Sequence, residues 1–133
     1  MKIEIDYIKQ ILDSLEDCDN NDYPSLNYLM KSLNISMSHG REIIKLRFHL
    51  NILKDGGFVE CISDDFGIST GMNGDLIINS SVGTRITLLG AQLLESLKND
   101  TIWNKSKVLL KEISVETLKQ IPGLALNILM SFK

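Results

Sequence analysis

The sequence contains few residues of the types that cross-link chains or bind metals: two cysteines, two prolines and two histidines among 133 residues. Cys18 and Cys61 stand far apart, and neither has a second cysteine or a histidine at the spacing of a zinc site. His39 and His49 are ten residues apart, whereas two imidazoles that share a metal on one helix are about four residues apart. We therefore expect no disulfide framework, no metal site and no cofactor.

An excess of positive charge and a long apolar run are also missing. The formal net charge is −3 at pH 7, so the chain as a whole has no attraction for phosphate. No window reaches the roughly 18 apolar residues that a membrane-crossing helix needs. The N-terminal residues alternate charged and apolar side chains, unlike a secretory signal. We expect a cytoplasmic chain without a membrane span, in which any nucleic-acid binding depends on a local cluster of cations.

Catalytic motifs are absent as well. Gly67, Gly71 and Gly74 loosely resemble a phosphate-binding loop, but no Lys-Ser/Thr pair follows them and carboxylates surround them. The serine, aspartate and histidine residues form no nucleophile signature. His49 is expected to form a hydrogen bond that fixes its helix against a hairpin, rather than to act as a base. The sequence therefore predicts a protein that binds and does not catalyse.

Apolar residues make up 44% of the sequence, enough for one core of ordinary size. They recur at every third or fourth residue, the spacing that buries one face of a helix. This pattern predicts helices over residues 4–17, 26–33, 39–55, 88–98, 101–112 and 115–132. Pro122 and Gly123 are expected to split or kink the last helix, because proline lacks the N–H that a helix interior needs.

Strand-forming residues follow the third predicted helix, which a pair of glycines ends. Residues 58–62 predict one strand, and a second is expected at 76–79 or 84–88. The sequence between them, SDDFGISTGMNGD over 63–75, has the composition of a mobile hairpin tip rather than of a packed element. Three helices followed by a β-hairpin is the order of elements in a winged helix.

The predicted fold is therefore α+β and mainly helical, a winged helix-turn-helix domain over residues 1–100 with extra C-terminal helices over residues 101–133. The C-terminal segment carries more apolar positions than one buried stripe requires. Such a surface must be covered, either by packing onto the same chain or by a second copy in a two-fold dimer. The predicted dimer interface comprises Leu118, Ile121, Leu124 and Ile128.

Two stretches of the sequence match the pattern of a known family. The first, an aromatic-His-Leu run followed by apolar residues, a glycine and an apolar strand, comprises Phe48, His49, Leu50, Ile52, Leu53, Gly57, Phe58 and Val59. The second, after the predicted hairpin, comprises Arg85, Thr87, Gly90, Leu94, Glu95, Asp100 and Trp103. On these residues the chain resembles an uncharacterised bacterial and phage family, domain of unknown function 2513.

The resemblance covers residues 43–107 and, more loosely, the first predicted helix. It implies a winged-helix-like fold. It implies no activity, because the family has no established chemistry, and its frequent occurrence in prophages and mobile elements gives context only. The glycine-rich segment between the predicted strands and the apolar tail fall outside the pattern.

The third predicted helix holds a local cluster of cations, since four cations against one acid give residues 36–54 a charge of +3. In a helix-turn-helix, the N-terminal part of the second helix enters the major groove of DNA. The residues placed to reach phosphates or base edges there are Ser38, His39, Arg41, Glu42 and Lys45. The alternative interpretation of this cluster is an ordinary solvated basic face.

Acidic residues in the predicted hairpin argue against that docking. Asp64, Asp65 and Asp75 would approach DNA phosphates and be repelled by them. The same carboxylates suit a protein partner with a basic surface. Their other possible role is to keep an exposed hairpin edge from pairing with another chain.

Together these features predict a binding protein without a catalytic centre. The favoured function is a winged-helix DNA-binding transcriptional regulator of phage or mobile-element type, acting as a homodimer on double-stranded DNA. The alternative is a protein-interaction module, such as a phage adaptor or inhibitor, on a winged-helix scaffold that does not bind DNA.

Overall fold

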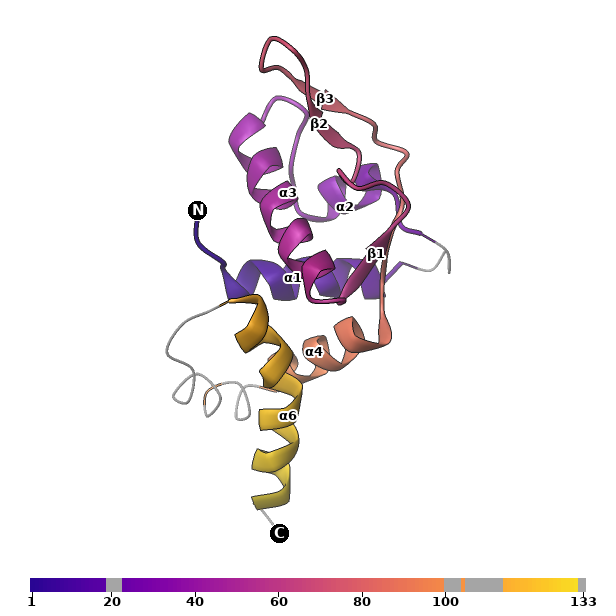
Figure 1. The fold of residues 1–133 in the computed structure, drawn as a ribbon. Coiled ribbons are helices and arrows are strands. Elements are labelled where there is room, and N and C mark those ends of the chain that lie inside the picture. Colours follow the sequence, from indigo (N-terminus) through magenta and orange to yellow (C-terminus); the bar gives the residue numbers. More distant parts are fainter. Residues whose placement is uncertain (19–22, 100–103, 105–113, 132–133) are drawn as a thin grey trace.

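The computed structural model describes residues 1–18, 23–99, 104 and 114–131, with the side chains of the last helix described up to Gly123. Its elements in chain order are α1 (Ile5–Glu16), α2 (Leu26–Ser32), α3 (Gly40–Asp55), β1 (Val59–Cys61), β2 (Ile68–Thr70), β3 (Leu76–Ile78), β4 (Thr84–Ile86), α4 (Leu88–Lys98) and α6 (Val115–Ser131). The described chain is α+β, with two small antiparallel sheets. Figure 1 shows α1 between two groups of elements, with α2, α3 and the strands on one side and α4 and α6 on the other.

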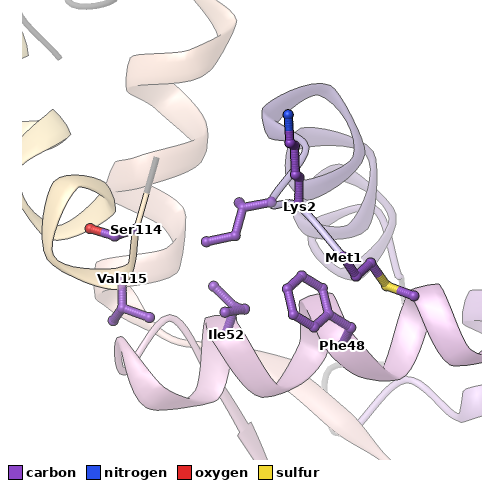
Figure 2. Close-up of a pocket in the computed structure, with 7 residues that line it drawn as sticks. Met1, Lys2, Phe48, Ile52, Ser114 and Val115 are labelled. Atoms are coloured by element: carbon purple, nitrogen blue, oxygen red, sulfur yellow. The ribbon is translucent and has the colours of Figure 1, made fainter. Parts of the chain in front are cut away.

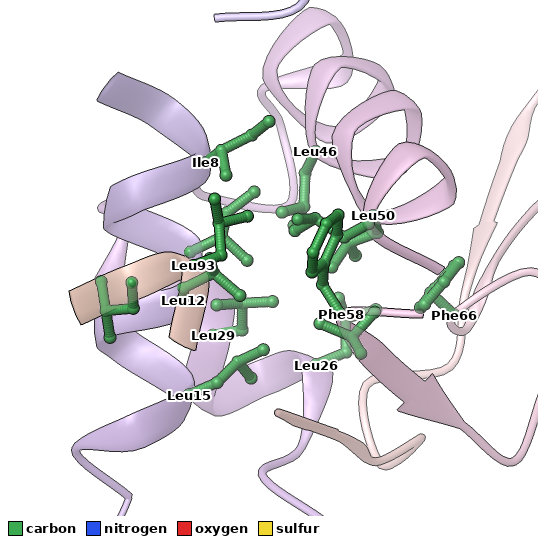
Figure 3. Packing of buried hydrophobic residues seen from close by; sticks show 14 of the residues in the cluster. Ile8, Leu12, Leu15, Leu26, Leu29, Leu46, Leu50, Phe58, Phe66 and Leu93 are labelled. Atoms are coloured by element: carbon green, nitrogen blue, oxygen red, sulfur yellow. The ribbon is translucent and has the colours of Figure 1, made fainter. Parts of the chain in front are cut away.

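The core forms where α1, α2, α3 and α4 turn their apolar faces toward one another (Figure 3). On α1 the buried apolar side chains are those of Ile8, Ile11, Leu12 and Leu15, at the helical spacing that the sequence predicts. Phe58, three residues after the end of α3, belongs to the same cluster and is 1% exposed. Burying one such side chain contributes about 1.5–3 kcal/mol, so this cluster is the main source of stability.

A two-stranded sheet closes one side of the helices. β1 and β4 run antiparallel, and Glu60 lies opposite Arg85. These two side chains form an ion pair with an N–O distance of 2.7 Å. An isolated bridge between Ser25 and Gly83 places the start of α2 beside β4, and the Ser25 hydroxyl caps α2 by accepting the N–H of Tyr28 at 3.1 Å.

Thr87 fixes the turn from β4 into α4. Its hydroxyl donates to the carbonyl oxygen of Gly57, 2.6 Å away, and accepts the N–H of Gly90 at 3.1 Å. Gly90 packs against the backbone of Phe58, so closely that a Cβ at this position would collide with the Phe58 carbonyl oxygen. Thr87 and Gly90, three residues apart, therefore hold the start of α4 against residues 57–58, just after α3.

The prediction of an unpacked hairpin tip over residues 63–75 is wrong for the first half of that segment. This half contains β2, which pairs with β3, and the side chains of Phe66 and Ile68 are fully buried. Arg47 of α3 donates from its guanidinium to the carbonyl oxygen of Ile68 at 3.5 Å and to the hydroxyl of Thr70 at 3.3 Å. The hairpin lies along α3 because its apolar side chains reach the core. Both positions considered for the second strand are strands, β3 and β4.

Helix α6 packs onto α4 and α3 of its own chain (Figure 1). Leu118 and Ile121 are both 0% exposed and belong to the core cluster. Their assignment to a dimer interface is therefore corrected, since side chains buried within one chain are not available to a second copy. The side chains of Leu124 and Ile128 lie outside the described residues.

The last helix is also continuous. α6 runs through Pro122 as one helix, so the predicted split does not occur, and the alternative of a kink at Pro122 stays a prediction. The helix predicted over residues 101–112 lies outside the described residues apart from residue 104. Within the described ranges, no helix has both the length and the apolar character needed to cross a membrane.

Candidate functional site on helix α3

The start of α3 and the two residues before it keep most of the predicted DNA-contacting residues together at the surface. Ser38, His39, Arg41 and Glu42 are all exposed. Two of them already have local partners: the His39 ring accepts the backbone N–H of Ser36 at 3.3 Å, and the Ser38 hydroxyl lies 2.8 Å from that of Ser36. Arg41 is the cation of this turn.

The other cations of α3 are used within the chain. The ammonium of Lys45 lies 3.0 Å from the carboxylate of Glu4 and 4.5 Å from the centre of the Tyr7 ring. Lys54 forms an ion pair with Asp64 at 3.0 Å, and Arg47 holds the β2–β3 hairpin as described above. Lys45, predicted to contact DNA with Arg41, thus faces α1. The sequence pattern missed this contact because Glu4 is remote from α3 in the chain.

A buried polar cluster lies between α1 and α3. The His49 side chain is fully buried, and burial lowers its pKa. The hydroxyl of Tyr7 is buried without a hydrogen-bond partner among the described residues. Burial, reinforced by the charges of Glu42 and Glu4, raises the pKa of Tyr7 to about 12. His49 contacts α1 rather than the hairpin, so the predicted hydrogen bond to the hairpin is corrected.

The outward face of α3 carries an apolar stripe instead of a row of cations. Ile44 is 38% exposed, and Phe48 and Ile52 are partly exposed. Residues four apart lie on one helix face, so these three side chains form a continuous line. The spacing of apolar residues along α3 does not distinguish these side chains from the buried ones, since all of them recur at helical intervals.

An apolar groove of about 710 Å³ runs beside this stripe. Its lining consists of Met1, Lys2, Ile3, Phe48, Ile52, Ser114 and Val115. Figure 2 shows Phe48 and Ile52 extending from α3 into the space between the N-terminal residues and the start of α6. Segments from three parts of the chain therefore shape one surface hollow.

The acidic residues predicted to bind a partner do not gather at one place. Asp64 is paired with Lys54. The Asp65 carboxylate accepts the hydroxyl of Ser63 at 2.7 Å and the N–H of Gly67 at 2.9 Å, and these bonds lower its pKa. Asp75 lies at the far end of the β2–β3 hairpin, next to the tip. Asp64 and Asp65 therefore already have structural contacts.

The described residues contain no group of three histidine, cysteine, aspartate or glutamate side chains that could hold a metal ion. Cys18 and Cys61 are not joined by a disulfide. What the α3 face offers is an apolar surface with charges at its ends, which suits binding.

Comparison with known proteins places this chain in a family. Residues 2–116 match the family described as "Hypothetical protein (DUF2513)", and the chain belongs to it, as its sequence motifs predicted. An uncharacterized protein of Haemophilus influenzae is 28% identical over 78 residues, a match that covers 56% of this chain and 58% of that relative's length. No solved structure matches the chain.

Proposed function

We propose that this chain is a protein-binding module on a winged-helix scaffold, and that it binds its partner through the outward face of α3. The order α1, α2, α3, β1, β4, with the Ser25–Gly83 bridge beside β4, supports the winged-helix assignment. In this assignment the β2–β3 hairpin is the wing, and α2 with α3 is the helix-turn-helix.

The observation that carries the proposal is the composition of the α3 surface. In a helix that reads DNA, the outward face supplies cations and hydrogen-bond donors to phosphates and base edges. Here that face presents Ile44, Phe48 and Ile52, while three of the four cations on α3 are bonded within the chain. Apolar residues at this spacing are typical of a helix that packs against another helix.

A photo-crosslinking amino acid in place of Ile44 tests the proposal in cells that produce the chain. We expect a covalent adduct with a protein, which mass spectrometry identifies and which re-forms from the two purified components. The matched control places the same amino acid at Gln92, an exposed position on α4, and should give no such adduct. An adduct with DNA at position 44, or equal protein adducts at both positions, would overturn the proposal.

The second candidate function is DNA binding through the start of α3. The observation that favours it is the exposed turn of Ser38, His39 and Arg41, the part of a recognition helix that enters the major groove. If it holds, binding to labelled duplex DNA weakens steeply with added salt, and Arg41→Ala reduces it. Absence of binding at low salt would remove this candidate.

A further inference from the structure

The outward stripe of α3 has the same layout in both directions from Phe48. Ile44 and Ile52 stand four residues before and after Phe48, and Arg41 and Asp55 stand seven residues before and after it. Positions at these intervals lie on one face of a helix. The face therefore has an aromatic centre, an isoleucine on each side, and opposite charges at its two ends.

We propose that this face binds a second copy of the chain, with the two α3 helices antiparallel and related by a two-fold axis near Phe48. The inference rests on the proposed function and names its partner. In this arrangement Arg41 of each copy faces Asp55 of the other, so the attraction occurs twice. The apolar side chains lie between the two ion pairs, which is the usual layout of a protein interface.

The two charged ends are available for this contact. Arg41 and Asp55 are exposed, and neither forms an ion pair with another residue in the described part of the chain. The cations on the flanks, Lys45 and Arg47, are bonded within their own chain. They therefore add little repulsion when a second α3 approaches.

The shape of the surface fits the same arrangement. Ile44 is exposed at one end of the stripe, and the groove of about 710 Å³ lies beside its centre and other end, at Phe48 and Ile52. An antiparallel pair brings Ile44 of one copy next to Ile52 of the other, where the groove can receive it. Each copy then offers an exposed isoleucine to the groove of the other, so the same contact forms twice.

Analytical ultracentrifugation of the full chain over a range of concentrations tests the proposal. One helix face per copy is a small contact, so we expect a dimer that dissociates on dilution, with a Kd in the micromolar range. Arg41→Asp and Asp55→Arg each replace two attractions by two repulsions and should raise the Kd about ten-fold. The double variant restores opposite charges and should return the Kd to the wild-type range.

Ile44→Asp should abolish the dimer, whereas Ile62→Asp, at an apolar position that is 78% exposed and lies outside the stripe, should leave it intact. Circular dichroism and thermal melting check that each variant folds.

A monomer at every concentration, or no recovery in the double variant, would overturn the inference. If the chain is monomeric but position 44 still crosslinks to a different protein, the proposed function stands and this partner is wrong. If position 44 crosslinks to DNA, both fail.

Discussion

His49 of α3 accepts a hydrogen bond from the backbone N–H of Glu4, 45 residues earlier in the chain, at 3.0 Å. Its other ring nitrogen, Nδ1, lies 2.8 Å from the carbonyl oxygen of Lys45. A carbonyl can only accept, so Nδ1 carries the proton and Nε2 is the acceptor. The neutral imidazole therefore joins the start of α1 to α3, and a protonated ring would lose the bond to Glu4.

This contact makes stability depend on pH. Burial lowers the pKa of His49, and the nearby charges of Glu4 and Lys45 act on it in opposite directions. In the unfolded chain His49 has the ordinary pKa near 6.5, so between that pH and the lower folded pKa it binds a proton in the unfolded state but not in the folded state. We expect the free energy of unfolding to fall as the pH drops below about 6.5 and to level off below the folded pKa. Urea denaturation at a series of pH values measures it.

His49→Leu removes the titrating ring and serves as the comparison variant. It should be less stable at neutral pH, because the bond to Glu4 is lost, and its stability should change less between neutral and mildly acidic pH. If the slope in His49→Leu equals that of the wild type, His49 is not the group responsible.

Gly90→Ala should destabilise the fold although alanine favours helices. Alanine gains about 1 kcal/mol over glycine in a helix interior. At Gly90, however, the added Cβ meets the carbonyl oxygen of Phe58 and the side chain of Ile86, and overpacking of this kind costs about 1–3 kcal/mol. Because the Phe58 obstacle is backbone, we expect a net loss of stability, measured by urea denaturation.

Gly123→Ala is the matched control. Gly123 also lies inside a helix, but among the residues that the structure describes no atom stands within 4 Å of the place that a Cβ would take. Only the helix preference then operates, so stability should stay the same or rise by up to about 1 kcal/mol. A stabilising Gly90→Ala would mean that α4 is not seated against Phe58 as described.

The helices could be predicted from the sequence because their signals are local. The bounds predicted for the fourth helix are those of α4, Leu88–Lys98, and α3 differs from its predicted range by one residue. The hairpin could not be predicted in the same way. Its glycines and aspartates indicate a loop, whereas Phe66 and Ile68 are buried in a core cluster whose other members come from helices remote in the sequence.

The candidate site was predicted in part for the same reason. Exposure of Arg41 and its neighbours follows from the helix start and was predicted. The pairing of Lys45 with Glu4 depends on how α1 crosses α3, which no spacing within α3 encodes. The groove beside Phe48 and Ile52 needs residues from both ends of the chain, so only the folded structure reveals it.

Leu118→Ala tests whether α6 is part of the same core. Because Leu118 is fully buried within its own chain, we expect a loss of about 2–5 kcal/mol in the free energy of unfolding. The difference from wild type should not depend on protein concentration, as it would if the contact were between two copies. Lys119→Ala, at the exposed neighbouring position, should change stability by less than about 0.5 kcal/mol. If the loss in the free energy of unfolding depended on protein concentration, Leu118 would lie in a contact between two copies of the chain.

Ile68→Ala tests whether the β2–β3 hairpin belongs to the folded core. Ile68 is 0% exposed, whereas Ile77, on the paired strand one residue from Ile68's own partner, is 54% exposed. Truncating a buried isoleucine removes transfer energy and leaves a cavity, so Ile68→Ala should cost about 2–5 kcal/mol. Ile77→Ala removes the same atoms from a solvated side chain and should change stability by less than about 0.5 kcal/mol. If both variants had the same small effect on urea denaturation, the β2–β3 hairpin would not be part of the folded core.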